Sequence, residues 1–205
     1  MAAPAALPIV QILGVAASAS LLSGWRLYLV VLATGIAMRT GYVPLPEHLA
    51  GLQVLASPWV IGAAGFAALC EFFADKIAFI DSLWDTVHTV IRPIGGALLA
   101  LAIVDPSDPA TQTIALLLGG GGALLAHGSK AGIRALVNTS PEPVSNVVVS
   151  TAEDIASSGL LLLMYTHPVA AGVIAIGLLL SAIALLLVAR RVLRKLFRRE
   201  DRAQT

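Results

Sequence analysis

The sequence predicts an all-α protein, a polytopic bundle of transmembrane helices with six spans. Three observations support this. The 205 residues are 58% hydrophobic, and the mean hydropathy is +0.88. Only 12% of the residues are charged, against about 25% in soluble domains. Apolar stretches long enough to cross a bilayer recur along the chain, separated by short polar turns. A chain of this length with short loops forms one domain.

The first apolar stretch, from Pro8 to Met38, is longer than the roughly 20 residues that one span needs. Ser18, Ser23 and Gly24 interrupt it. We therefore predict residues 1–24 to be an N-terminal apolar segment, interfacial or re-entrant, followed by a tilted span. A seventh span at residues 8–22 is the alternative. The N-terminus has no basic region before its apolar stretch, so we expect it to be retained rather than cleaved.

The transmembrane bundle is predicted over residues 25–195, with a basic tail at 196–205. Gly41 and three prolines mark the loop before the second span. The remaining spans are predicted at residues 58–80, 82–104, 111–137, 147–165 and 169–193. Polar turns at 105–110 and 138–146 separate them.

Charge predicts the orientation in the membrane. Seven of the thirteen basic residues lie at and just after the end of the last apolar run, namely Arg190, Arg191, Arg194, Lys195, Arg198, Arg199 and Arg202. By the positive-inside rule this places the C-terminus in the cytoplasm and the protein in the inner membrane. Six spans then put the N-terminus on the same side. A nucleic-acid partner is not expected, because the basic cluster directly adjoins a span.

Ionisable and amide side chains set among the apolar stretches are the candidate functional residues. A charge at the bilayer centre costs roughly 2.5–3.5 kcal/mol on insertion scales, so such groups are usually paired or line a polar path. The candidates are Glu71, Asp75, Lys76, Asp81, Asp85, His88, Arg92, His127, Lys130, Arg134, Asn138, Asn146, Glu153 and Asp154.

The third span carries Asp81, Asp85, His88 and Arg92 on one helical face, as their spacing of four, three and four residues requires. Such a stripe can relay protons or coordinate a cation. Alternatively, Asp81 and Asp85 are ordinary first-turn residues stabilised by the helix dipole. Capping does not explain Arg92, which lies three turns into the helix and needs a partner.

We expect Arg92 to pair with Glu153 or Asp154, two turns into the fifth span. This pairing fits a weak internal repeat, in which the hairpin of spans two and three resembles that of spans four and five when Lys76 is aligned with Lys130. Internal repeats are common in transporter folds. Two amphipathic hairpins also produce such a match by chance.

A second network is expected between Glu71 and Asp75 on span two and Lys130 and Arg134 on span four. His127 shares the face of the two basic residues. The carboxylates alternatively bind a hard cation, although the neighbouring basic groups compete. No metal site, cofactor or catalytic residue is predicted: two histidines lack a third zinc ligand, and the single Cys70 excludes a cysteine cluster and an internal disulfide.

Glycines inside the spans have two interpretations. They let helix backbones approach closely, or they unwind a helix so that its carbonyls face a cavity. Candidate hinges are Pro93, Gly95, Gly96, Gly119, Gly120, Gly121 and Gly122.

The segments EFFADKIAFIDSLWDTVHTVIRPIGGALLA and HGSKAGIRALVNTSPEPVSN, followed by VVSTAED, resemble a bacterial and plant family of multi-pass membrane proteins, domain of unknown function 4126. The resemblance covers residues 12–195 and implies a membrane fold. It implies no particular activity.

Our leading functional hypothesis is therefore transport, by a channel, carrier or flippase, of a small ion or an amphiphile with a charged head group. The first alternative is a non-transporting scaffold that binds a partner or anionic lipid. The second is an intramembrane lipid-modifying enzyme, which no motif in the sequence supports. The lipid bilayer is an expected partner. The sequence is compatible with a homo-oligomer, but no motif predicts one.

Overall fold

The computed structural model describes residues 9–42, 53–103, 108–138 and 143–203, and within these ranges the chain forms helices and no strand. The predicted all-α class is confirmed. Parts of the predicted loops, and the first eight residues, lie outside the described ranges. The six helices are α1 (Ile9–Arg39), α2 (Pro58–Ala74), α3 (Ala78–Ile103), α4 (Pro109–Asn138), α5 (Pro143–Thr166) and α6 (Pro168–Ala203).

Local sequence signals set where the helices begin. A proline lacks the N–H that the first helical turn leaves unused, and its fixed φ suits that position. Asp108 precedes α4 and accepts hydrogen bonds from the backbone N–H groups of Ala110 (3.1 Å) and Thr111 (3.3 Å), as an N-cap does. Four helices start on a proline: Pro58, Pro109, Pro143 and Pro168.

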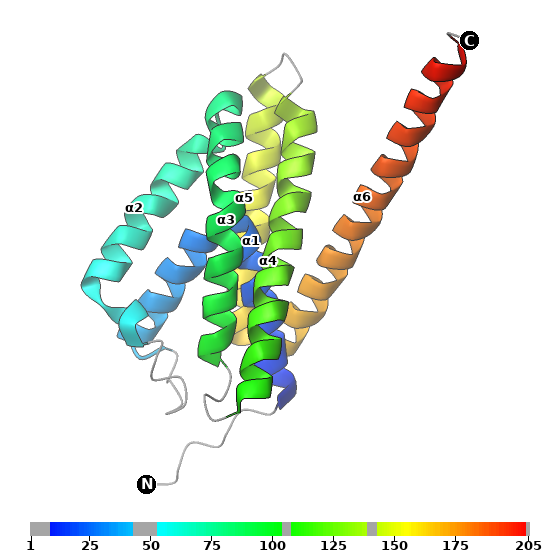
Figure 1. The fold of residues 1–205 in the computed structure, drawn as a ribbon. Coiled ribbons are helices and arrows are strands. Elements are labelled where there is room, and N and C mark those ends of the chain that lie inside the picture. Colours follow the sequence, from blue (N-terminus) through cyan, green and yellow to red (C-terminus); the bar gives the residue numbers. More distant parts are fainter. Residues whose placement is uncertain (1–8, 43–52, 104–107, 139–142, 204–205) are drawn as a thin grey trace, which may run out of the picture.

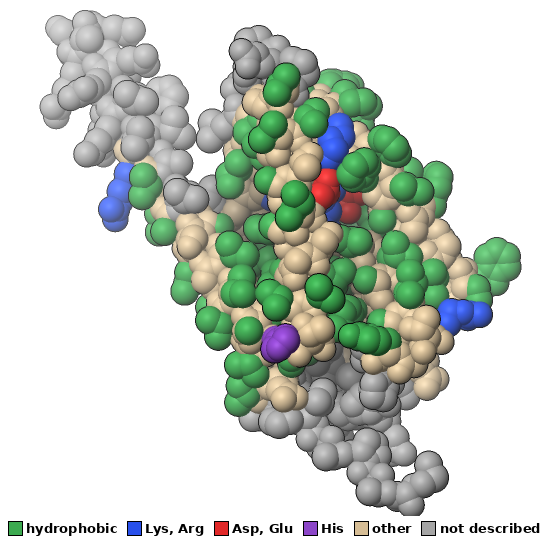
Figure 2. Space-filling model, turned by 180° about the vertical axis from the view of Figure 1, so that it is seen from behind, with side chains coloured by type: hydrophobic (Ala, Val, Ile, Leu, Met, Phe, Trp, Pro, Cys, Tyr) green, Lys and Arg blue, Asp and Glu red, His purple; other side chains and the backbone are tan. Residues whose placement is uncertain are grey.

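Three segments are long and apolar enough to cross a membrane: Leu13–Arg39, Pro109–Ala135 and Val144–Thr166. Large hydrophobic side chains such as Phe66, Phe79 and Ile155 are exposed. Figure 2 shows hydrophobic side chains over most of the face drawn. Such a surface suits lipid rather than water, and the chain is a membrane protein.

Helix α1 doubles back on itself. Its backbone leaves the helical conformation at Arg26 (φ −145°, ψ 62°), and its two halves diverge from that point (Figure 1). A Cβ atom on Gly14, in the first half, would meet the backbone of Pro168 at the start of α6. Thr34, in the second half, hydrogen-bonds Tyr165 near the end of α5, with 2.6 Å between the oxygens. Both ends of α1 therefore lie at the same end of the bundle.

This course differs from the tilted span predicted for residues 25–39. The second half of α1 returns toward the end at which the first half began, so the helix does not pass from one end of the bundle to the other. The interruption was expected near Gly24 and lies at Arg26. Length and apolar composition are the same for a straight span and a bent one, which is why the sequence did not distinguish them.

The two ends of the bundle differ in character. We call the end that holds the α2–α3 and α4–α5 connections the charged end, and the other the opposite end (Figure 1). Toward the opposite end the core is apolar and joins α1, α5 and neighbouring helices. It includes Leu21, Leu22, Leu27, Leu160, Leu161 and Met164.

Close packing of α3 on α4 explains part of the glycine run. A Cβ atom on Gly119 would collide with Ala100 and with the carbonyl of Gly96. Helix α4 continues unbroken through the run, and α3 continues through Pro93. Close packing is thus confirmed for Gly96 and Gly119, and the unwound alternative is wrong for α4. A hinge role for these residues stays a prediction.

Candidate functional site: a buried charge network

Charged side chains from α1 to α5 meet between the middle of the bundle and its charged end. All of them are buried except Lys76, Glu153 and Asp154, whose side chains are 19%, 17% and 23% exposed. We call this set the charge network. It consists of Arg26, Glu71, Asp75, Lys76, Asp81, Asp85, Arg92, Lys130, Arg134, Glu153 and Asp154.

The deepest part of the network is organised by Arg92. Its guanidinium lies 2.6 Å from Glu71 and 3.1 Å from Asp85, and it donates to Nδ1 of His127 at 2.6 Å. The expected pairing of Arg92 with an α5 carboxylate is therefore wrong. Glu71 of α2 and Asp85 of α3 itself satisfy Arg92 instead.

These contacts fix the protonation of His127. Because a guanidinium only donates, Nδ1 of His127 is an acceptor, and its Nε2–H donates to the Asp85 carbonyl at 3.1 Å. His88 donates from Nδ1 to the Trp84 carbonyl (2.7 Å), and its Nε2 is hydrogen-bonded to the hydroxyl of Tyr28 (2.9 Å). His88 thus shares a helix with the predicted stripe but pairs with α1.

The middle of the network is organised by Asp75, at the C-terminal cap of α2. Its carboxylate lies 2.6 Å from Arg26 and 3.0 Å from Lys130. The predicted contact between Asp75 and Lys130 is confirmed. Lys130 also lies 3.7 Å from Glu153, and Arg26 lies 2.5 Å from Asp154. Both α5 carboxylates are therefore bound to cations other than Arg92.

Lys76 joins the α2–α3 turn to α5. Its ammonium lies 2.8 Å from Asp154 and donates to the hydroxyl of Ser150. The same ammonium lies over the ring of Phe72, 4.2 Å from its centroid. This contact is the outermost link of the network on the α5 side.

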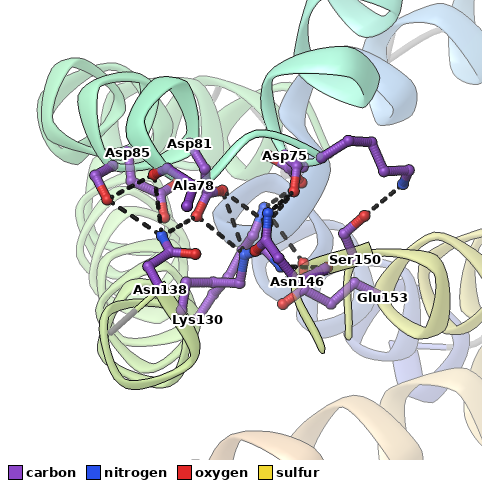
Figure 3. A network of polar contacts seen from close by, with 12 residues as sticks. Asp75, Ala78, Asp81, Asp85, Lys130, Asn138, Asn146, Ser150 and Glu153 are labelled. Atoms are coloured by element: carbon purple, nitrogen blue, oxygen red, sulfur yellow. Dashed lines mark hydrogen bonds and ion pairs between the residues drawn. The ribbon is translucent and has the colours of Figure 1, made fainter. Parts of the chain in front are cut away.

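At the charged end, Arg134 and Asp81 form an ion pair of 3.1 Å, and Asn138 donates to Asp81 at 2.8 Å (Figure 3). Arg134 also donates to the backbone carbonyls of Asn146 and Asp75. The expected pairing of Arg134 with a carboxylate of span two is replaced by this one. Asp81 lies in the first turn of α3, but its carboxylate binds side chains of the neighbouring helix α4.

Arg26 is the member of the charge network that the sequence-based prediction did not include. The helix break at this position frees backbone carbonyls that a continuous helix would use. The carbonyl of Gly24 accepts from Arg92 (3.3 Å) and that of Trp25 from Lys130 (3.4 Å). An available signal was an arginine inside an apolar stretch, directly after a serine- and glycine-rich segment.

Several buried polar atoms in and beside the network have no hydrogen-bond partner among the described residues. Buried polar groups in native proteins are normally satisfied by protein or water. The atoms include Oε2 of Glu71, Oδ1 of Asp75, Nε of Arg92, Oε2 of Glu153 and Oγ of Ser157. This part of the bundle therefore has polar capacity beyond what the protein itself uses.

The arrangement pairs buried charges of opposite sign across helices. In the described part of the chain, no group of three or more His, Cys, Asp or Glu side chains is placed to hold a metal ion. The network draws on five helices, so any movement of one helix changes the partners of charges on another.

Comparison of the chain with curated proteins and with solved structures gave no match. One family model does match, over residues 13–188, which includes α2 to α5 in full, most of α1, part of α6 and every member of the charge network. The protein therefore belongs to the family described as a domain of unknown function, DUF4126.

Proposed function

We propose that this protein is a membrane transport protein that moves a small ion, or an amphiphile with a charged head group, by way of the charge network. The observation that carries the proposal is the break of α1 at Arg26, inside the bundle and next to Asp75. Non-helical backbone at membrane depth is tolerated where it is buried in protein or lines a polar cavity. Broken helices of this kind form the ion and substrate sites of many transporters.

The proposed topology has five crossings, α2 to α6, and one re-entrant helix, α1. Lys76 belongs to the turn between α2 and α3, and Lys130 and Arg134 belong to the last part of α4. These segments lie toward the charged end, as does the C-terminal end of α6 (Figure 1). The positive-inside rule then makes the charged end cytoplasmic in the inner membrane. With five crossings the N-terminus is on the external side, and not in the cytoplasm as six straight spans would require.

The two hairpins of the internal repeat are alike in their direction and in the charges that they supply. The hairpins α2–α3 and α4–α5 turn at the same end of the bundle, and each supplies both signs of charge to the network. The aligned residues Arg92 and Glu153 do not pair with one another. We propose the two hairpins as the moving parts of the transport cycle.

The unpartnered polar atoms support the proposal. Oδ1 of Asp75 and Nε of Arg92 are buried and have no hydrogen-bond partner among the described residues. Leaving a buried polar group unsatisfied costs about 1–3 kcal/mol. Water or a polar solute that reached the network would therefore find groups to bind.

The path is closed toward the external side. The apolar core that includes Leu22, Leu27 and Leu161 lies between the network and the opposite end. A solute that enters the network from the cytoplasm can therefore pass the apolar core only after α1 moves. We propose the break at Arg26 as the point around which its two halves move.

A second candidate, a non-transporting scaffold, is favoured by one observation. Every charged member of the network has at least one ion-pair partner. In this case the basic C-terminal tail would be the functional part, through attraction to anionic lipid.

Reconstitution into liposomes tests these candidates. Three probes are used: a pH-sensitive dye for protons, a potassium-sensitive dye, and a phospholipid with a fluorescent head group exposed to an impermeant reductant. We expect the wild type to exceed empty vesicles with at least one probe, and Arg26→Gln to reduce that rate at least tenfold. Arg39→Gln, outside the network, is the matched control. If no probe moves faster than in empty vesicles, the transport proposal fails and the scaffold remains.

A further inference from the structure

The charge network contains one carboxylate more than it has cations. Its basic members are Arg26, Lys76, Arg92, Lys130 and Arg134. Its acidic members are Glu71, Asp75, Asp81, Asp85, Glu153 and Asp154. His127 does not restore the balance, because its Nδ1 accepts a hydrogen bond from Arg92 and the ring is therefore neutral. His88 is held between the Trp84 carbonyl and the Tyr28 hydroxyl.

The distances identify Glu153 as the carboxylate in excess. The other five carboxylates each have a basic nitrogen at 3.1 Å or less. Glu153 has only Lys130, at 3.7 Å, and Lys130 is closer to Asp75 (3.0 Å) and to the Trp25 carbonyl (3.4 Å). Oε2 of Glu153 is buried and has no hydrogen-bond partner among the described residues.

The groups that face Glu153 come from each neighbouring element. Lys130 and Arg134 of α4 and Arg26 of α1 act on it as positive charges, and Asp75 of the α2–α3 turn acts as a negative one. On α5 itself, Asp154 is the adjacent charge. Ser157 lies one turn further along α5, and its buried hydroxyl also has no partner among the described residues. Helix α6 packs on α5 and adds no ion pair to Glu153 in the described part of the chain.

We infer that Glu153 is a proton-binding site, which carries its proton in the arrangement described here and exchanges it with the cytoplasmic side through Asp154 and Lys76. An ionised carboxylate without its own cation is costly to bury, and a bound proton removes that cost. The network then has as many negative charges as positive ones. The proton taken up by Oε2 comes from water at the charged end and returns there on release.

The route for the proton is visible on the surface. Figure 2 shows acidic and basic side chains exposed together within an otherwise hydrophobic face. The members of the network that are partly exposed are Lys76, Glu153 and Asp154, while all the others are buried. Asp154 connects the surface to the break in α1, because it pairs with both Lys76 and Arg26, and Glu153 is its neighbour along α5.

Proton release would act directly on that break. An ionised Glu153 competes with Asp75 for Lys130, because the same ammonium lies near both carboxylates. Lys130 also donates to the Trp25 carbonyl, next to the break at Arg26. Drawing Lys130 toward Glu153 would therefore loosen two contacts that hold the tip of α1. This coupling role rests on the proposed transport function; the proton site does not.

Two measurements test the site without any transport assay. A hydrophobic carbodiimide reacts with protonated carboxyl groups in apolar surroundings, and mass spectrometry locates the label on wild-type protein in liposomes. We expect the label on Glu153, with less of it as pH rises, and little on Asp154 or Glu71, which are held in short ion pairs. Label on another carboxyl of the network in place of Glu153, or none at all, would overturn the proposal.

Infrared spectroscopy of the same samples provides the second test. The band of the protonated carboxyl group should be present in the wild type at neutral pH, absent in Glu153→Gln and retained in Asp108→Asn, a carboxyl outside the network whose removal leaves the charge balance of the network unchanged. A band that persists in Glu153→Gln would show that another group carries the proton and would overturn the assignment to Glu153. If both measurements agree with the proposal while the wild type moves none of the three probes, the proton site stands and the transport function fails.

Discussion

Arg26 and Asp75 form an ion pair of 2.6 Å at the point where α1 breaks, and both side chains are almost fully buried. The pair joins the bend of α1 to the turn between α2 and α3. It therefore connects the non-helical backbone at Arg26 to the charged end of the bundle. Four predictions follow from this arrangement and from the packing around it.

Replacing Arg26 should destabilise the protein strongly. Removing one partner of a buried ion pair leaves an uncompensated charge and costs about 3–5 kcal/mol. We expect Arg26→Met to lower the free energy of unfolding by about 3 kcal/mol, near the lower limit, because Asp75 keeps Lys130 and Asp154 keeps Lys76. Equilibrium unfolding in mixed micelles measures this. Arg39→Met, an exposed arginine, should change stability by about 0.5 kcal/mol or less, and equal losses in the two variants would contradict the assigned role.

Double-mutant cycles should distinguish the observed partners of Arg92 from those that the sequence suggested. Residues in contact couple by about 0.5–3 kcal/mol, whereas separate sites add within about 0.5 kcal/mol. The cycle of Arg92→Met with Glu71→Gln should show coupling, because the two groups lie 2.6 Å apart. The cycle of Arg92→Met with Glu153→Gln should be close to additive. The reverse outcome would restore the pairing expected from the internal repeat.

The glycine run of α4 supplies a test with an internal control. A Cβ atom on Gly119 would collide with Ala100 and the Gly96 carbonyl, whereas one on Gly121 meets nothing within 4 Å. Gly119→Ala should therefore lower the melting temperature by pushing α3 from α4. Gly121→Ala should be neutral, or stabilising by up to about 1 kcal/mol from helix propensity. Similar effects of the two substitutions would contradict the close contact between the helices.

Cysteine labelling should decide the course of α1 in the membrane. In a Cys70→Ser background, Val10→Cys places an exposed thiol in the first turn of α1, and Tyr42→Cys places one just after its last residue. His167→Cys marks the α5–α6 turn. If α1 is re-entrant, an impermeant maleimide should reach all three from the same side of sealed vesicles. Labelling of residues 10 and 42 from opposite sides would show that α1 crosses the bilayer.

For Arg92, the sequence predicted the need for a buried partner but not the identity of that partner. Its depth in an apolar helix, beyond the reach of a cap, correctly indicated that a buried partner must exist. The partner itself was chosen from a repeat alignment, which is a relation along the chain. Glu71 and Asp85 became the partners through the relative rotation and depth of α2 and α3, and these depend on packing that no local pattern records.

The sequence by itself determined that the chain is helical, where α2, α4 and α6 begin to within two residues, and which side chains could not face lipid. Apolar length, prolines at helix starts and the cost of bare charge in hydrocarbon are local properties, and each can be recognised in a short window. Only the tertiary structure decided that α1 turns back at Arg26, which cation serves which carboxylate, and that Glu153 lacks a cation of its own. These features depend on groups far apart in the chain, and their energies exist only once the helices have packed.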